Sequence, residues 1–236
     1  MSYFKAGIGS PHALLELSRK RVPGIEALNI FGINKDIGTA YETLWNGPAA
    51  FVYPSSALQM SAASSSASDT MPILIQGLDA NYEKIDEIIT LNGTTPVTTS
   101  QSFYRINTVV ILAGNNVGNI SLTNGGVTYA YIAQTHGLTQ ACAYTVPAGC
   151  ELFLFRIDLT SGTVSNNQYL TYRNVTRTST GRELRVAEAT WQIGQQSFDR
   201  QVPFRIAEKT DFKFEIKGSL AGNEASIFVE AVLMEI

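Results

Sequence analysis

Residues 118–129, with the sequence GNISLTNGGVTY, carry the strongest local fold signal in the chain. Apolar and polar residues alternate before the Asn124-Gly125 dipeptide, and a second β-type run follows it. Asn and Gly adopt positive φ angles at low cost, and a two-residue hairpin turn requires such angles. The pattern therefore predicts a β-hairpin that turns at Asn124 and Gly125.

Similar short runs precede this hairpin and are separated by turn residues. Residues 73–79 and 84–91 form two of them. Alternation in the second run places Ile85, Glu87 and Ile89 on one face, so Glu87 interrupts an otherwise apolar pattern. Both runs are predicted to be strands.

A second unit is predicted to begin near His136-Gly137. Its first two runs, residues 141–146 and 150–159, flank the turn residues Pro147-Ala148-Gly149 and are expected to form another hairpin. Five further β-type runs follow, at residues 168–175, 184–193, 202–207, 212–216 and 227–236. Short strands at intervals of about ten residues, with turns between them, are typical of a β-sandwich.

These patterns predict a mostly β protein with two sandwich-like or jelly-roll-like units behind a short helical arm. The expected boundaries are residues 1–24 for the N-terminal arm, 25–136 for an N-terminal β domain and 137–236 for a C-terminal β-sandwich domain. Sandwiches and jelly rolls share the same period-two signal, so the strand order stays open.

The arm differs in character from the rest of the chain. Ser10 is a suitable N-cap and Pro11 suits the first helical position, which predicts a short helix from there. Arg19, Lys20 and Arg21 are expected in its last turn, where cations favour the helix dipole. So short a helix is marginal alone and should pack on its own body or on a neighbouring subunit. The residues predicted to make this interface are Tyr3, Phe4, Leu14, Leu17, Arg19 and Arg21.

Composition narrows the classes of function. The chain has 236 residues, 44% of them hydrophobic and 16% charged, with a net charge of -3. The acidic balance argues against binding to nucleic acid, which needs a basic surface. The low charge indicates either a surface covered by partners or simply a Thr/Ser-rich β surface, and both remain open. Neither a signal peptide nor a membrane span is expected, so we predict no membrane partner and synthesis in the cytoplasm.

The sequence contains few residues suited to catalysis or to binding a metal ion or cofactor. The 2 His and 2 Cys lack the spacing of a metal site, so we predict no catalytic, cofactor-binding or metal-binding residue. Cys142 and Cys150 are expected to be buried free thiols. The acidic residues of segment 79–86 predict a solvated turn rather than a calcium site. Core or interface packing is expected, rather than a sugar-stacking platform, for the aromatic residues Tyr3, Phe4, Trp45, Tyr129, Tyr131, Tyr169, Tyr172 and Trp191.

Three motifs carry a family resemblance. Residues 77–82 read GLDANY, residues 90–97 read TLNGTTPV and residues 144–149 read YTVPAG. These resemble motifs of a family of tailed-bacteriophage virion structural proteins, and the similarity extends over most of the chain from about Ile25. At Cys150 the chain departs from the family, in which Lys is commoner.

The resemblance implies a virion structural protein with no catalytic residues to transfer, so an enzyme is not expected. Our hypothesis is a capsid cement or decoration protein, a homotrimer on the capsid surface that clamps neighbouring major capsid proteins. Two alternatives are a neck or tail-attached component and an adhesin that binds host polysaccharide.

Overall fold

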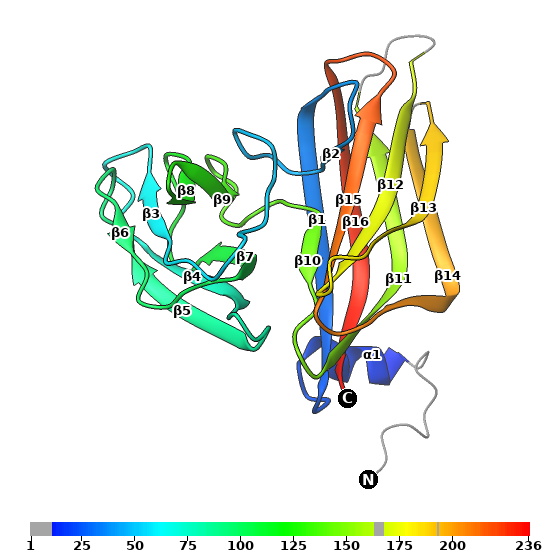
Figure 1. Ribbon diagram of the computed structural model, residues 1–236, viewed down its shortest axis with the longest axis horizontal. Helices are drawn as coiled ribbons and strands as arrows, with labels where there is room; N and C mark the ends of the chain where they lie inside the picture. Colours follow the sequence, from blue (N-terminus) through cyan, green and yellow to red (C-terminus); the bar gives the residue numbers. More distant parts are fainter. Residues whose placement is uncertain (1–10, 163–167, 193) are drawn as a thin grey trace.

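The computed structural model describes residues 11–162, 168–192 and 194–236. Nearly all of the regular structure is β, arranged in antiparallel sheets, and a single helix precedes the strands in the described ranges. Two β units stand side by side (Figure 1). The predicted fold class, mostly β with a short helix at the N-terminal end, is confirmed.

The larger unit is a sandwich of two sheets. One sheet has the strand order β1-β16-β11-β14, formed by Ile25–Ile37, Asn223–Glu235, Cys150–Ser161 and Gly194–Ile206. The other has the order β10-β15-β12-β13, formed by Ala143–Thr145, Thr210–Gly218, Leu170–Thr178 and Glu183–Trp191, and the short β2 (Glu42–Thr43) also pairs with β15. Figure 1 shows the two sheets face to face.

Alternating apolar residues fill the space between these sheets. Phe212, Phe214 and Ile216 of β15 are fully buried, and Ile227 and Val229 of β16 face the same core. This is the period-two burial expected of strands with one face toward a core. Because each such side chain contributes roughly 1.5–3 kcal/mol when buried, the sandwich core is a large stabilising term.

The smaller unit consists of two small sheets around a second core. One has the order β6-β3-β8-β9, formed by Val97–Thr98, Ser61–Ser64, Ile120–Asn124 and Val127–Ile132. The other has the order β5-β4-β7, formed by Lys84–Thr90, Pro72–Leu78 and Arg105–Ile111. Its core includes Met60, Ile73, Ile75, Phe103, Ile120 and Leu122.

Local predictions in the smaller unit are largely confirmed. Strands β8 and β9 form the expected hairpin, but Asn124 pairs with Val127, so the turn lies at Gly125 and Gly126, one residue later than predicted. Both glycines have positive φ angles, which glycine adopts without a Cβ clash. In β5, Glu87 lies on the predicted face and accepts hydrogen bonds from the backbone N–H groups of Ser100 and Gln101.

The grouping of strands differs from the predicted domain boundaries. Strand β1 pairs along its length with β16, from Ile25 opposite Met234 to Asn34 opposite Ala225. Strand β2 pairs with β15. Both therefore belong to the sandwich rather than to a unit of residues 25–136, and the smaller unit is an insertion between β2 and β10. The alternation within β1 indicates that it is a strand but carries no information about its partner.

The predicted hairpin around Pro147-Ala148-Gly149 is wrong. Strand β10 pairs with β15, whereas β11 pairs with β16 and β14, so this turn connects the two sheets of the sandwich. The Val146 N–H donates to the Thr210 carbonyl, which holds the chain to β15 just before the crossing. Cys142 and Cys150 are buried and free, as predicted, and burial raises the pKa of the Cys142 thiol.

The helix α1 spans Pro11–Ser18, where a short helix was predicted, and its predicted N-cap Ser10 lies outside the described residues. Arg19, Lys20 and Arg21 follow the helix instead of forming its last turn. Lys20 has a positive φ angle and the Arg21 N–H donates to the Glu16 carbonyl, a reversal that closes the helix end. The chain then enters β1, beside which α1 lies (Figure 1).

Candidate functional site: the joint and groove between the two β units

No cluster of three or more His, Cys, Asp or Glu side chains suited to a metal ion occurs among the described residues. Likewise, no helix in the described ranges is long and apolar enough to cross a membrane. The features that set this molecule apart are the contacts between its two units and the strand edges that it leaves uncovered.

A buried ion pair between Arg105 and Asp211 joins the two units, and we call this contact and the residues packed around it the joint. Arg105, the first residue of β7 in the smaller unit, donates from Nε to Asp211 Oδ1 at 2.7 Å and from Nη2 to Asp211 Oδ2 at 2.9 Å. Asp211 belongs to β15 of the sandwich. Both side chains are only 6% exposed. A two-point contact of this kind fixes orientation as well as distance.

Further contacts satisfy both charged groups. Arg105 Nη1 donates to the carbonyls of Pro54 and Tyr104, and Thr145 Oγ1 donates to Asp211 Oδ1. Burial alone would lower the pKa of Arg105, but the hydrogen bonds and charge of Asp211 outweigh that effect and raise it. The guanidinium therefore stays charged inside the joint, where an unpaired charge would be very costly.

Aromatic rings enclose the Arg105 guanidinium. Its Cζ lies 3.9 Å from the ring centroid of Tyr104 and 4.7 Å from that of Tyr53. Such cation–π contacts strengthen when they are shielded from water. Tyr104 in turn packs edge-on against Tyr82, so aromatic packing extends the joint beyond the ion pair.

Backbone contacts hold the units in register next to the ion pair. The Asn107 side chain accepts from the Thr145 N–H at 2.8 Å and donates to the Thr145 carbonyl at 3.0 Å. The amide thus pairs with β10 as a neighbouring strand would. In addition, the Ala148 N–H donates to the Tyr82 carbonyl. These contacts give the two units one defined relative position.

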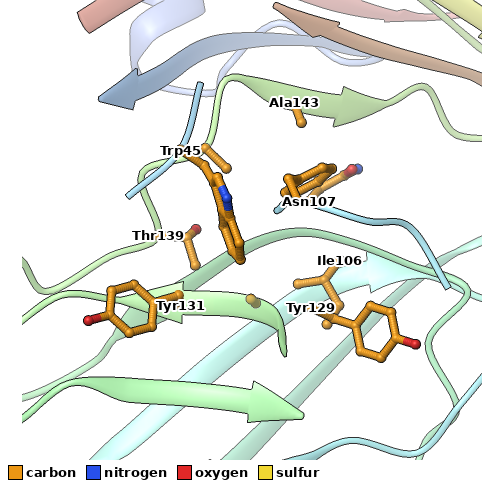
Figure 2. Close-up of a pocket in the computed structure, with 10 residues that line it drawn as sticks. Trp45, Ile106, Asn107, Tyr129, Tyr131, Thr139 and Ala143 are labelled. Carbon is orange, nitrogen blue, oxygen red and sulfur yellow. The ribbon is translucent and has the colours of Figure 1, made fainter. Parts of the chain in front are cut away.

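The two segments that connect the units, one after β2 and one before β10, also lie side by side. Trp45 pairs with Ala141, and Figure 2 shows the Trp45 side chain pointing into a small cavity lined by Asn107, Thr139 and Tyr131. The cavity measures about 10 Å³, which is room for about one water molecule. Trp45 is buried, and its Nε1 donates to the Ala49 carbonyl. Its role is packing, as expected.

Among the other aromatic residues considered for sugar stacking, Tyr129 and Tyr131 line the same small cavity as Trp45. Tyr172 and Trp191 pack against each other in the sandwich core, and Tyr169 is exposed elsewhere. The arrangement fits core and interface packing better than a carbohydrate surface.

A larger groove of about 420 Å³ separates β1 from the smaller unit. Its sandwich wall includes the consecutive residues Leu28, Asn29, Ile30 and Phe31 of β1. Its other wall is formed by residues 76–78 of β4, Lys84 and Asp86 of β5, residues 107–108 of β7, and residues of segment 138–147, which includes β10.

The opposite edge of the sandwich is exposed. Every side chain from Glu183 to Glu188 of β13 is exposed, although neighbouring residues of a strand face opposite sides. In β14, Val202 is 79% exposed. Each of these two strands pairs on one side only within the described ranges. This outer edge offers both backbone and apolar side chains for contact.

Of the six residues predicted to form an interface, the structure describes the side chains of Leu17, Arg19 and Arg21 only. Tyr3 and Phe4 lie outside the described residues, and only the backbone of Leu14 is described. Leu17 is partly buried on α1, while Arg19 and Arg21 are exposed and pair with Glu16.

Sequence reasoning missed Arg105 and Asp211. The one available signal was an arginine next to Tyr104 at the start of an apolar strand, where a charge needs a buried partner. The identity of that partner, more than a hundred residues away, had no sequence signal.

No family model matches this chain, and no curated protein matches its sequence. Solved structures give weak matches. One, from the infectious bursal disease virus Gt strain, has a TM-score of 0.23 at 11% identity and covers 90% of this chain and 75% of its own. The VP2 subviral particle of the same virus gives a TM-score of 0.22 at 10% identity, with coverages of 91% and 77%. Similarity at this level does not establish a common fold.

Proposed function

We propose that the chain is a structural, non-catalytic protein of a bacteriophage particle: a capsid cement or decoration protein that clamps neighbouring major capsid proteins as a homotrimer. The observation that supports this most directly is the Arg105–Asp211 joint between the two β units. A clamp must hold two contact surfaces at a constant separation, and a buried two-point ion pair restricts hinge motion between them.

Uncovered strand edges and apolar side chains supply surfaces for such contacts. Val202, Leu184 and Val186 are exposed on the outer edge of the sandwich. Exposed apolar patches on a protein of low charge are common where a neighbour covers them. Repeated around a symmetric shell, individually weak contacts of this kind combine into strong attachment.

The N-terminal arm adds a further contact surface in this proposal. The helix α1 exposes Leu15 and is followed by Arg19, Lys20 and Arg21. Deleting residues 1–22 should therefore weaken attachment to heads while both β units remain folded. Unchanged binding of the deleted protein to heads would exclude the arm from attachment.

The copy number per particle tests the proposal as a whole. Purified virions would be analysed by quantitative mass spectrometry, with the major capsid protein as the internal reference. Hundreds of copies in a simple ratio to the shell protein would support a shell-wide cement role. A dozen copies or fewer would instead assign the protein to the neck or tail. Absence from the particle would overturn the structural assignment.

A further inference from the structure

The groove between the two units follows the edge of a strand. Consecutive strand residues point to opposite faces, so a groove lined by Leu28, Asn29, Ile30 and Phe31 in sequence must lie along the edge of β1. Strand β1 pairs only with β16 in the described chain. Within the described residues, the backbone of β1 from Glu26 to Ile33 makes no backbone hydrogen bonds except those to β16. Half of its backbone groups are thus available to a further strand.

The opposite wall suits a chain with one apolar and one polar face. Leu78 and Tyr144 supply buried or partly buried apolar surface, and Leu138 is 44% exposed. Lys84 and Asp86 are exposed at the rim. An unpaired strand edge beside alternating apolar and polar surface is the arrangement used to bind an extended peptide by strand addition.

We propose that this groove binds residues 1–10 of a second copy of the chain, which add as a strand to the edge of β1. The proposal rests on the self-association that forms part of the proposed function, and it names the segment and the site that produce it.

The sequence of this segment complements the groove. Residues 1–10 read MSYFKAGIGS, and period-two alternation would place Phe4, Ala6 and Ile8 on one face. The other face would carry Lys5, the only charged side chain in the segment, which suits the carboxylate of Asp86 at the rim. Ten extended residues span about 33 Å, which exceeds the roughly 20 Å occupied by the six residues of β1 at the groove.

The position of α1 favours a second copy over the chain's own segment. The helix is joined to β1 through its C-terminal end, and its N-terminal end at Pro11 points toward the β11–β14 side of the sandwich (Figure 1). The groove lies on the other side of β1, next to the smaller unit. A segment that leaves one side of each subunit and enters the other side of the next makes a head-to-tail contact, which can close into a ring.

Photo-crosslinking tests this directly. The full chain would carry a photoreactive benzoylphenylalanine in place of Phe4, an aromatic substitution outside both β units. Isotopically heavy and light preparations would be mixed, irradiated and digested, and the crosslinked peptides identified by mass spectrometry. A matched control carries the same residue in place of Val202, which is exposed at the far edge of the sandwich.

The expected result is crosslinks from position 4 to groove peptides, in particular residues 26–31, 76–86 or 138–144, with heavy–light pairs at the frequency expected from random mixing. The control should not label these peptides. Crosslinks confined to single chains, crosslinks that map outside the groove, or no crosslinks at all would each overturn the inference.

Sedimentation velocity of the same full chain separates failure of this inference from failure of the proposed function. An oligomer without groove crosslinks would disprove the strand addition while leaving self-association intact. A protein that is monomeric at all concentrations would disprove both. Copy number in virions, which does not depend on the groove, would still report on the particle role.

Discussion

The joint between the two units and the outer edge of the sandwich differ in how far their charged side chains are exposed to solvent. At the joint, Arg105 and Asp211 are almost fully buried, and each is bonded to several partners. At the outer edge, Arg156 lies near Asp199, whose side chain is 75% exposed, and Val202 extends into solvent. The difference shows that the ion pair between the two units is shielded from water, whereas the outer edge of the sandwich presents charged and apolar side chains to solvent.

The largest effect is expected from breaking the joint. Replacing Asp211→Ala leaves the Arg105 guanidinium buried without its counter-charge and removes the acceptor of Thr145 Oγ1. Removing one partner of a buried pair costs about 3–5 kcal/mol. The free energy of unfolding, measured by urea denaturation, should fall by this amount.

The matched control acts on the exposed pair. Asp199→Ala removes a carboxylate 3.6 Å from Arg156, and solvent screens that interaction. Exposed pairs contribute about 0–1 kcal/mol. Equal losses of unfolding free energy in Asp211→Ala and Asp199→Ala would show that the buried pair stabilises the protein no more than the exposed pair does.

A smaller effect is expected from the amide that pairs with β10. Asn107→Ala removes both hydrogen bonds to Thr145, whose backbone would lose these partners beside the joint. Leaving buried polar groups unsatisfied costs about 1–3 kcal/mol. Asn124→Ala, which removes one exposed bond to the Gln59 carbonyl within the smaller unit, provides the comparison. Equal urea midpoints for the two variants would show that the Asn107 contact adds nothing to the joint.

Acid should weaken the smaller unit through a carboxylate away from the joint. Burial alone would raise the pKa of Asp69, but hydrogen bonds from Ser64 Oγ and the N–H groups of Val117 and Gly118 outweigh it and lower the pKa. Its stabilising contribution is therefore fully present above the ordinary aspartate pKa and is lost as the pH falls through the lowered value.

The corresponding measurement compares the native protein with Asp69→Asn, which cannot ionise at this position. The difference in unfolding free energy should be largest near neutral pH and should shrink as the solution is acidified. A difference that is independent of pH would show that the charge of Asp69 does not contribute.

The smallest effect is expected at the outer edge. Val202→Ser changes a side chain that is 79% exposed, so the unfolding free energy should change by no more than about 0.5 kcal/mol. Thermal unfolding of the isolated protein is a sufficient test. A loss above about 1 kcal/mol would mean that this edge is packed within the molecule and is not a free surface.

Local features of the fold were predictable because a few neighbouring residues determine them. The β8–β9 hairpin follows from its glycines, and the placement of Glu87 follows from alternation in β5. The presence of a short helix at Pro11–Ser18 follows from the local sequence around Pro11. The helix end differs from the prediction by a few residues, since Arg19, Lys20 and Arg21 take part in the reversal that follows it.

The candidate site was much less accessible to prediction. Arg105 and Asp211 are separated by more than a hundred residues, and the groove exists only because residues 26–31 of β1 face parts of the inserted unit that lie far from them in the sequence. Neither charge nor spacing in the sequence indicates that Arg105 contacts Asp211 or that the segments lining the groove face each other.

By itself the sequence determined that the protein is built mostly of β-strands and has two buried thiols, because periodicity and turn residues act over a few positions. Only the tertiary structure decided that β1 pairs with β16, that Pro147-Ala148-Gly149 joins two sheets, and that Arg105 meets Asp211. Strand pairing and buried ion pairs depend on which surfaces meet when the chain collapses. Period-two alternation is the same for every possible partner, so it leaves that choice to the fold as a whole.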